Sequence, residues 1–277
     1  MENDRHPFSL EGKHAVLIGG GGAIGSAVAI GMSEAGAVVA VCDLSLEKAR
    51  STLEHIRSEG GEGTTHEVDA LSKTSLLAAR NAILENHARV DILVNLAGGN
   101  LSEASTSQDQ SFFDIPLAAM EKTVAINLFA GAFLPTQVFA EEMVQNESGG
   151  SIINTASMNA LRPLTRIPAY SAAKAAVSNF TQWLAVHIAQ EYTPKLRVNA
   201  IAPGFFLTDQ NRYLLVDPST NALTGRGETI VSHTPMGRLG DPKDLSGAAV
   251  WLASPASEFV TGVVLPIDGG FSAFSGV

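Results

Sequence analysis

Three side chains between residues 157 and 174 could together move a proton. Tyr170 and Lys174 are four residues apart in a stretch from position 168 to about 190 whose apolar residues recur at helical spacing. Residues four apart lie on one face of a helix, so the phenol and the ammonium are expected side by side. A neighbouring positive charge lowers the pKa of a tyrosine from its usual value of about 10. Such a tyrosine can accept a proton from an alcohol or return it to a carbonyl.

Ser157 follows the apolar run at 151–155, which predicts a buried strand ending beside it. Open α/β sheets bind ligands beyond the carboxyl ends of their strands, so Ser157 is expected at the ligand site. Its hydroxyl could hold the same substrate oxygen that the tyrosine protonates. Because Tyr-x-x-x-Lys alone is a weak motif, its interpretation depends on the elements around it.

The composition limits the classes of protein and partner. The 277 residues carry a formal net charge of −10, with 45% hydrophobic residues and 26 glycines, which is typical of a globular α/β protein. The negative charge argues against a nucleic-acid partner, and an anionic substrate would need a local cationic pocket. No bilayer-length apolar run or basic-then-apolar leader is visible, which predicts a cytoplasmic protein without a membrane partner. The single cysteine, Cys42, predicts a buried inert thiol.

A glycine-rich loop at 19–25 follows the apolar run at 14–18, and a helical pattern opens at Ile24. Strand, glycine loop and helix together predict a site where backbone N–H groups bind a pyrophosphate. Asp43 closes the next apolar run, eighteen residues beyond Gly25. An acid at this position binds ribose hydroxyls and repels a 2′-phosphate. Neither the glycine loop nor residues 44–46 contain a Lys or Arg that could bind this phosphate, so NAD is favoured over NADP. An alternative role for Asp43 is to cap the helix expected at 45–58.

Strand and helix patterns alternate along the whole chain without a break in composition. This predicts one Rossmann-like α/β domain over residues 1–277, a doubly wound parallel sheet with helices on both faces. Within it lie the glycine loop (19–25), the catalytic segment (157–174) and a variable substrate loop (about 205–240). The expected strands are 14–18, 37–42, 63–68, 91–96, 151–155, 196–201 and 262–267, and the expected helices include 72–87 and 116–145.

The helical pattern at 116–145 contains Asn127 among apolar residues, and Pro135 could kink it. A buried amide must be hydrogen-bonded, so a purely structural role for Asn127 competes with a catalytic one. The polar stretch at 100–116 lacks periodicity, which predicts a surface loop at the lip of the active site.

With these motifs in this order, the chain resembles the short-chain dehydrogenase/reductase family, in its single-domain form, over nearly its whole length. The family's Thr-Gly-x-x-x-Gly-x-Gly falls on 18–25, with Ile18 and Ala23 departing from the pattern, and its Asn-Asn-Ala-Gly falls on 95–98. The resemblance implies a nicotinamide dinucleotide held by Gly19, Gly22, Ile24, Gly25, Asp43, Asp69, Ala70, Asn95, Ala97, Gly98, Tyr170, Lys174, Pro203, Gly204 and Thr208.

The same resemblance implies the catalytic roles. Tyr170 is the general acid/base, and Ser157 orients the substrate oxygen. Lys174 binds the nicotinamide ribose and lowers the tyrosine's pKa, while Asn127 holds a water in a proton relay. Hydride then passes between the nicotinamide and a secondary alcohol or ketone, and no metal is required. Family resemblance also implies a homotetramer.

A narrower resemblance, in segments such as PAYSAAK and TPMGR, is to family members that interconvert sugar acids of the D-mannonate/D-fructuronate type. A hydroxy- or keto-acid needs a cation, and arginine suits a carboxylate. The candidate substrate residues are Asn100, Asn159, Arg166 and Arg212, with Arg162, Gln210 and Asn211 nearby. The alternatives are another polyol or aldonate dehydrogenase, a 3-oxoacyl reductase whose apolar pocket uses Phe205 and Phe206, and a non-catalytic NAD sensor.

Overall fold

The centre of the protein is a parallel β-sheet. The computed structural model describes residues 6–208 and 211–276, and within them the sheet has seven strands in the order β3-β2-β1-β4-β5-β6-β7. The strands are β1 (His14–Ile18), β2 (Val38–Asp43), β3 (Gly63–Glu67), β4 (Ile92–Asn95), β5 (Gly150–Thr155), β6 (Leu196–Pro203) and β7 (Val264–Ile267). The predicted doubly wound, single-domain fold is confirmed, and each expected strand is present with its ends shifted by at most two residues.

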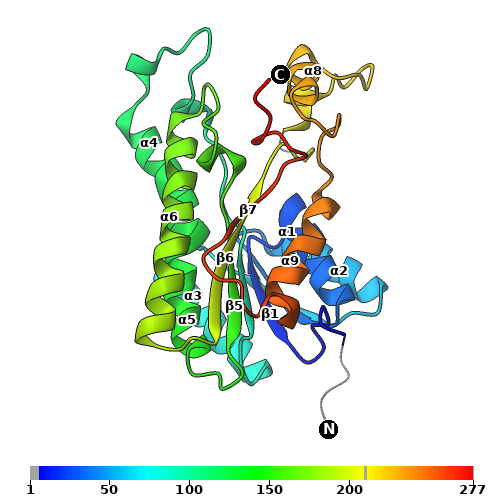
Figure 1. Cartoon of the computed structure of the whole chain (residues 1–277), viewed down its shortest axis with the longest axis vertical. Helices are drawn as coiled ribbons and strands as arrows, with labels where there is room; N and C mark the ends of the chain where they lie inside the picture. Colours follow the sequence, from blue (N-terminus) through cyan, green and yellow to red (C-terminus); the bar gives the residue numbers. More distant parts are fainter. Residues whose placement is uncertain (1–5, 209–210, 277) are drawn as a thin grey trace.

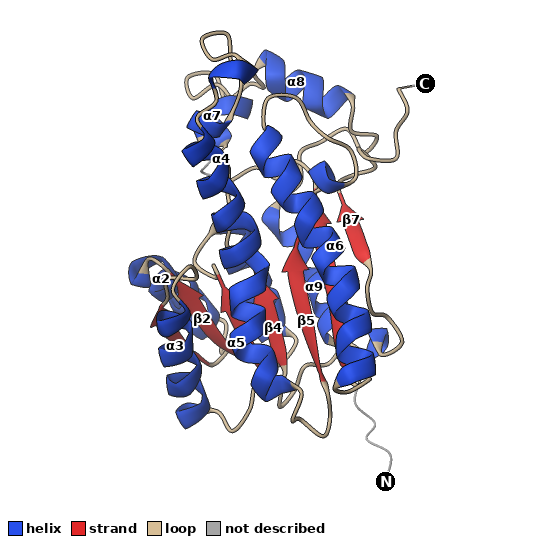
Figure 2. Cartoon of the chain, turned by 90° about the vertical axis from the view of Figure 1, so that its left-hand side faces the viewer, coloured by secondary structure: helices blue, strands red, loops and turns tan. Residues whose placement is uncertain are grey.

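Helices cover both faces of the sheet (Figure 1). One face carries α1 (Ala23–Glu34), α2 (Leu46–Ser58) and α9 (Ser246–Ala253). The other face carries α3 (Lys73–Asn86), α4 (Leu117–Val124), the π-helical segment η3 (Ala125–Phe133), α5 (Leu134–Met143) and α6 (Pro168–Glu191). Two short helices, α7 (Arg212–Leu215) and α8 (Gly225–Ser232), lie beyond the carboxyl ends of the strands (Figure 2).

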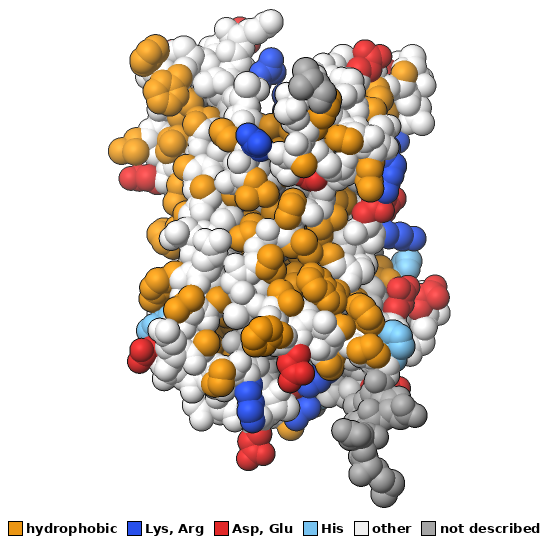
Figure 3. Space-filling view, in the orientation of Figure 1, with side chains coloured by type: hydrophobic (Ala, Val, Ile, Leu, Met, Phe, Trp, Pro, Cys, Tyr) orange, Lys and Arg blue, Asp and Glu red, His pale blue; other side chains and the backbone are white. Residues whose placement is uncertain are grey.

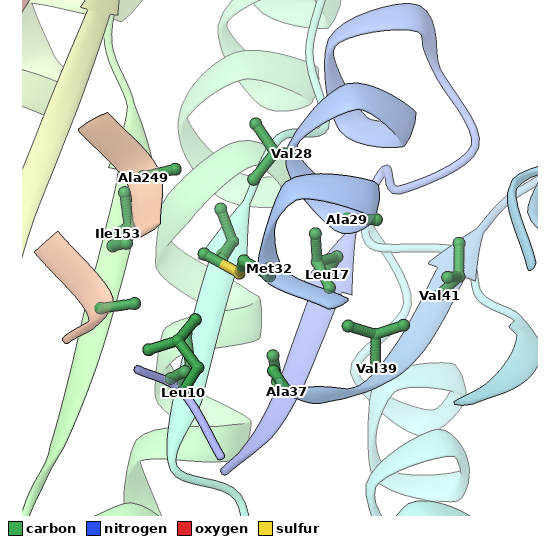
Figure 4. Close-up of a cluster of buried hydrophobic side chains, with 14 of the residues drawn as sticks. Leu10, Leu17, Val28, Ala29, Met32, Ala37, Val39, Val41, Ile153 and Ala249 are labelled. Carbon is green, nitrogen blue, oxygen red and sulfur yellow. The ribbon is translucent and has the colours of Figure 1, made fainter. Parts of the chain in front are cut away.

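Alternation along the strands divides the core into two layers. In β2, Val39 and Val41 pack toward α1 and α2, while Ala40 and Cys42 pack on the other face with α3. Leu17 of β1 meets Val28 and Met32 of α1 in the first layer (Figure 4). Burial raises the pKa of the Cys42 thiol to about 12, which confirms the buried, unreactive cysteine.

The order in which strands are added reverses between β1 and β4, because the chain builds outward from β1 to β3 and then continues with β4 on the other side of β1. At such a switch point the loops after neighbouring strands separate and leave a crevice. The loops that follow β1, β4, β5 and β6 carry the residues singled out by the sequence. The fold therefore brings the glycine loop and the catalytic segment to one edge of the sheet.

Side-chain caps begin some of the helices, and the longest helical stretch contains an irregular segment. Ser45 caps α2 by accepting a hydrogen bond from Lys48 N, and Asp241 opens a capping box with Asp244. The helical stretch runs without a break from α4 to α5. Its irregular part is the π-helical segment η3, which ends just before Pro135, the residue expected to kink the helix. A π-helical turn widens the backbone spiral, often at a functional site.

One described helical stretch, Leu117–Met143, has the length and apolar composition to cross a membrane. In the structure 56% of its apolar segment is buried inside the protein. That burial is the usual property of a core helix in a globular domain.

Candidate active site

A cleft of about 550 Å³ opens at the carboxyl ends of β1, β4, β5 and β6. Twelve residues named from the sequence line it: Gly19, Gly22, Ile24, Gly25, Gly98, Asn100, Ser157, Tyr170, Lys174, Pro203, Gly204 and Thr208. Residues from the loops after β1, β4, β5 and β6 and from helix α6 thus meet in one cavity. The sequence-based expectation that the glycine loop and the proton-handling side chains share a site agrees with this geometry.

Ser157, Tyr170 and Lys174 lie along the wall formed by β5 and α6. Lys174 is buried, and its Nζ donates a hydrogen bond of 2.7 Å to the carbonyl of Thr155. The same ammonium lies 5.6 Å from the centroid of the Tyr170 ring. The one-turn separation on α6 therefore produces the predicted adjacency of phenol and ammonium.

The pKa values of this pair depart from the sequence-based expectation. Burial raises the pKa of Tyr170 above its usual value, and a hydrogen bond with Ser157 offsets part of that rise. Burial also lowers the pKa of Lys174, to about 8. The net direction for Tyr170 is therefore opposite to the lowering expected from the lysine, because burial of the phenol is the largest effect on its pKa.

The glycine loop forms a cradle that fits a dinucleotide. A Cβ on Gly25 would lie 2.2 Å from the carbonyl oxygen of Gly19, so the loop can close this tightly only with glycine. Helix α1 begins at Ala23 with no side-chain cap, and its first turn lines the cleft. Uncapped N–H groups at a helix N-terminus are the usual binding site for a phosphate. The residues present therefore fit the pyrophosphate of a nicotinamide dinucleotide.

Asp43 holds the glycine loop against the end of β2. Its carboxylate accepts hydrogen bonds from Gly21 N and from Ser45 N, both at 3.0 Å. Ser45, not Asp43, caps α2, so the helix-cap alternative for Asp43 is wrong. Asp43 is half-buried and lies directly behind a cleft-lining glycine. A carboxylate at this position can still accept hydrogen bonds from ribose hydroxyls.

Asn127 lies in η3 and is completely buried. Its Oδ1 accepts from Gly99 N at 3.1 Å, and its Nδ2 donates to Gly99 O at 2.7 Å and to Thr123 O at 2.8 Å. The side chain therefore clamps the loop after β4 to the helix, which is the structural role anticipated as an alternative. The relay role for this residue stays a prediction.

Five of the residues expected around the cofactor do not line the cleft: Asp43, whose carboxylate lies behind Gly21, and Asn95, Asp69, Ala70 and Ala97. Asn95 is completely buried and donates to Thr136 Oγ1 at 3.0 Å and to Asn154 Oδ1 at 2.9 Å, so its side chain joins strands and helices inside the protein. Asp69 is exposed and accepts from Leu71 N, which shapes the turn after β3. Ala70 and Ala97 likewise lie outside the lining residues.

The candidate substrate residues separate into different places. Asn100 lines the cleft and donates to Ser105 Oγ at 2.9 Å. Asn159 is buried and accepts from Leu164 N, so it shapes its own loop. Arg166 is exposed at a φ of 76°, and Arg212 lines a separate depression with its guanidinium on Asn221. Gln210 lies outside the described residues.

Several cleft residues were not identified from the sequence as ligands. Lys48 on α2 lines the cleft beside Gly21, where a glycine Cβ would lie 2.7 Å from the Lys48 Cβ. Lys48 lies in the first turn of α2, two residues beyond the stretch 44–46 that contains no cation, and the fold turns it toward the glycine loop. Thr155 also lines the cleft, and its buried Oγ1 has no hydrogen-bond partner among the described residues. Its position at the end of a predicted strand was the available signal.

This arrangement can polarise and protonate one oxygen atom. The hydroxyls of Ser157 and Tyr170 lie in one cleft and can hydrogen-bond the same carbonyl or alcohol oxygen. The proton is held at the Tyr170 oxygen, and Lys174 is fixed beside it through Thr155. A bound nicotinamide would supply or accept the hydride. Fold and site together define a dinucleotide-dependent oxidoreductase of the doubly wound α/β class.

A family model described as enoyl-(acyl carrier protein) reductase matches residues 21–272. The chain belongs to the short-chain dehydrogenase/reductase family, and it is an NAD(P)-dependent oxidoreductase, as its resemblance implied. It is 44% identical to the uncharacterized oxidoreductase UxuB of Bacillus subtilis, over 97% of this chain and 98% of that protein.

Two solved structures with bound cofactor are similar over their whole length. One, from Haemophilus influenzae, carries the provisional name D-mannonate oxidoreductase and contains NAD; it is 42% identical, with a TM-score of 0.89 and coverage of 97% of this chain and 98% of that one. The other, from Agrobacterium tumefaciens, carries the provisional name 2-deoxy-D-gluconate 3-dehydrogenase and contains NADP. It is 33% identical, with a TM-score of 0.81 and coverage of 98% and 100%.

Proposed function

We propose that the protein oxidises or reduces a six-carbon sugar acid of the D-mannonate/D-fructuronate type with NAD. The observation that carries this proposal is the loop between Ser157 and Tyr170, which contains two exposed arginines, Arg162 and Arg166. A carboxylate substrate needs such a cation close to the reacting oxygen, since the protein as a whole is negatively charged. The provisional name of the Haemophilus relative supports the same substrate class.

The catalytic assignment follows the same line. We assign the proton transfer to Tyr170 and the orientation of the substrate oxygen to Ser157. Lys174 would bind the nicotinamide ribose and place its positive charge beside Tyr170. Asn127 would hold a relay water through its main chain, since its side-chain amide is already bonded to Gly99 and Thr123. Each of these roles remains open to substitution experiments.

Preference for NAD rests on Asp43, whose carboxylate would repel a 2′-phosphate. Lys48 acts in the opposite direction, because its ammonium could pair with that phosphate. We therefore expect NAD to be preferred without NADP being excluded. Asp43→Ser should reduce the NAD/NADP ratio of kcat/KM, and Lys48→Gln should increase it. A ratio unchanged in both variants would contradict this account of cofactor choice.

The decisive test is NADH formation by the purified protein with D-mannonate, with D-gluconate and a 3-hydroxyacyl thioester in parallel, followed by the reverse reaction with D-fructuronate. Turnover of mannonate and fructuronate alone supports the proposal. Turnover of gluconate alone would redirect it to another aldonate dehydrogenase. Binding of NADH without turnover of any substrate in either direction would favour the sensor alternative.

A reductase of the ketone in a 3-oxoacyl thioester is the second candidate, and a specific observation favours it. Phe205 and Phe206 both line the cleft, and they give its substrate end an apolar wall. The description of the matching family model also names an enzyme of acyl thioesters, although that enzyme reduces a carbon–carbon double bond and not a ketone. Activity with the thioester and none with either sugar acid would establish this candidate instead.

We further propose that the protein assembles as a homotetramer. The outer surface of η3 and α6 carries a continuous row of exposed and half-buried rings, here called the aromatic face: Phe129, Phe133, Phe180, Trp183, His187 and Tyr192. A second copy of this chain is the occupant that a self-complementary face of this kind would suit. On the side seen in Figure 3, hydrophobic side chains also spread across the middle of the molecule, which offers a second interface. Cytoplasmic location stays a prediction of the sequence.

A further inference from the structure

We infer that the C-terminal segment Asp268–Phe274, here called the C-terminal strap, backs the cleft wall at Phe205 and holds Arg162 ready to bind the substrate's carboxylate. This inference rests on the proposed sugar-acid function and names the residue that would recognise the acid. The sequence had favoured Arg166 and Arg212 for this role. Three consecutive contacts of the strap favour Arg162.

The first contact fixes the strap to the cofactor side of the cleft. Gly204, which lines the cleft after β6, donates to Ile267 O at 3.0 Å, and a Cβ on it would lie 2.6 Å from the Cβ of Asp268. Asp268 in turn accepts from Gly270 N and from Ser272 N, both at 2.9 Å. The aspartate therefore folds the first turn of the strap and fixes where Ser272 lies.

The second contact places the strap next to the cleft wall. Phe271 packs edge-on against Phe205, with the ring centroids 5.2 Å apart. Phe205 lines the cleft, so the strap backs a residue that substrate would meet. Figure 1 shows this last part of the chain rising past β7 toward the end of the molecule where α8 lies.

The third contact connects the strap to the catalytic loop. Arg162 Nε donates to Ser272 O at 3.1 Å, and the Arg162 main chain is fixed by its own bond to Met158 O at 2.9 Å. Met158 immediately follows Ser157, so the arginine is one short turn from the catalytic serine. The strap therefore spans from the cofactor side of the cleft to the proton-handling side.

The hydrogen bond to Ser272 leaves the carboxylate-binding end of the guanidinium available. Within residues 6–208 and 211–276, Nη1 and Nη2 of Arg162 make no hydrogen bond, and no carboxylate pairs with them. An arginine fork binds a carboxylate through two parallel N–H groups, and these two atoms form such a pair. The exposed Arg162 side chain is thus fixed through Nε, while Nη1 and Nη2 have no partner among the described residues.

Two other arginines around this end of the cleft are engaged elsewhere. Arg212 Nη2 donates to Asn221 Oδ1 at 3.0 Å, and Arg238 forms an ion pair with Asp244. The contact of Arg166 is through its main chain, since its carbonyl accepts from Thr106 N at 2.8 Å. Arg166 is thus the alternative that the experiment must exclude.

The test compares Arg162→Gln with Arg166→Gln and with a matched control, Arg57→Gln. Arg57 is also exposed and also donates to one backbone carbonyl, that of Gly63, but it lies on α2 away from the strap. Steady-state kinetics with D-mannonate and NAD should show KM for mannonate about 10- to 100-fold higher in Arg162→Gln, as expected for loss of hydrogen bonds to a charged group. The dissociation constant for NADH should stay within twofold of wild type in all three variants.

A second variant tests the strap itself. Phe271→Ala removes the ring that holds the strap on Phe205, so KM for mannonate should rise several-fold, while Phe271→Tyr should restore it. If Arg162→Gln keeps the wild-type KM, or if Arg166→Gln gives the larger increase, the inference is overturned and the sugar-acid function stands. If the wild type oxidises no sugar acid, the proposed function fails and this inference fails with it.

Discussion

Lys174 is a candidate catalytic residue whose chemistry is strongly changed by burial. Burial of its ammonium lowers the pKa from 10.5 to about 8, which corresponds to roughly 3 kcal/mol of folding free energy lost while the amine is charged. Among the described residues, the ammonium donates a hydrogen bond to the carbonyl of Thr155, a neutral acceptor, and pairs with no carboxylate. A group that is costly to bury and remains beside a reactive phenol is typical of a functional site.

Lys174→Met should therefore stabilise the protein at pH 7 and abolish turnover. Below about pH 8 the native lysine is charged, and the full desolvation penalty lowers the free energy of unfolding. Between about pH 8 and 10.5 the unfolded chain binds more protons than the native chain, so the stability of the wild type rises with pH. Urea titrations should show Lys174→Met more stable than wild type by about 1–3 kcal/mol at pH 7, with the difference shrinking at pH 9.5.

The control for that experiment is Tyr170→Phe, which removes the phenolic proton but no buried charge. Its stability difference from wild type should not follow the same pH window, while its turnover should fall by about 10²- to 10⁴-fold. A Lys174→Met variant that is less stable than wild type at pH 7 would show that the bond to Thr155 outweighs the desolvation of the ammonium.

At the scale of single residues, the sequence predicted contacts between side chains that are close in the chain. It did not predict contacts between residues that are far apart in the chain and meet only in the folded protein. Tyr170 and Lys174 could be paired because helical spacing alone places them together. The bond between Arg162 and Ser272 joins residues 110 positions apart, and no local pattern contains it. The sequence favoured Arg166 over Arg162, and it is the contact with the strap that favours Arg162.

At the scale of elements, the π-helical η3 packs unusually close to the loop after β4. A Cβ on Gly131 would lie 2.5 Å from the carbonyl oxygen of Ala97, and a Cβ on Gly98 would lie 2.7 Å from Asn127 Oδ1. These two glycines let the helix and the loop approach while Asn127 bonds both sides of Gly99. The position of the cleft-lining loop therefore depends on this helix.

Gly131→Ala should displace η3 from that loop. Because the clash is with backbone, we expect a loss of about 1–3 kcal/mol in the free energy of unfolding and weaker NADH binding, measured by denaturant titration and fluorescence. The matched control is Gly247→Ala in α9, where no atom lies within 4 Å of the added Cβ. That substitution should stabilise the helix by about 0.5–1 kcal/mol. Equal effects of the two alanines would contradict the close-packing account.

The elements differed in how far they could be predicted. Most strands were predicted because they are short apolar runs between turn residues, and burial on both faces of a parallel sheet requires that pattern. The edge strand β3, Gly63–Glu67, is the polar exception. The helix at 116–145 was predicted, but its π-helical part was not. The widened turn depends on packing against Ala97 and Gly99, and a hydrophobic pattern carries no information about that contact.

At the scale of the whole molecule, alternating strands and helices in one unbroken chain imply right-handed crossovers and a parallel sheet. That rule made the fold predictable, and the switch between β1 and β4 then made the location of the cleft predictable. What surrounds the cleft on the substrate side was not predictable to the same degree. Loops and the C-terminal strap there are positioned by contacts between distant segments, such as Phe205 with Phe271.

The aromatic face is the feature whose consequence extends beyond one chain. Its rings follow one another at centroid distances of 4.7–6.5 Å, and they border a groove of about 440 Å³ between α5 and α6, on the side that faces the viewer in Figure 2. Trp183 in the middle of the row is 56% exposed. A large aromatic surface left in water is costly, so pairing with a second copy would be favourable.

Trp183→Glu should therefore break the assembly, because a carboxylate in the centre of a self-complementary interface would meet its own copy across the two-fold axis. Light scattering after size-exclusion chromatography should show a smaller species than wild type at the same protein concentration. The matched control is Leu44→Glu, which changes another exposed apolar residue (70% exposed) at the end of β2, away from α5 and α6. If Trp183→Glu keeps the wild-type mass, the aromatic face is not the interface; if the wild type itself is a monomer, the tetramer proposal fails.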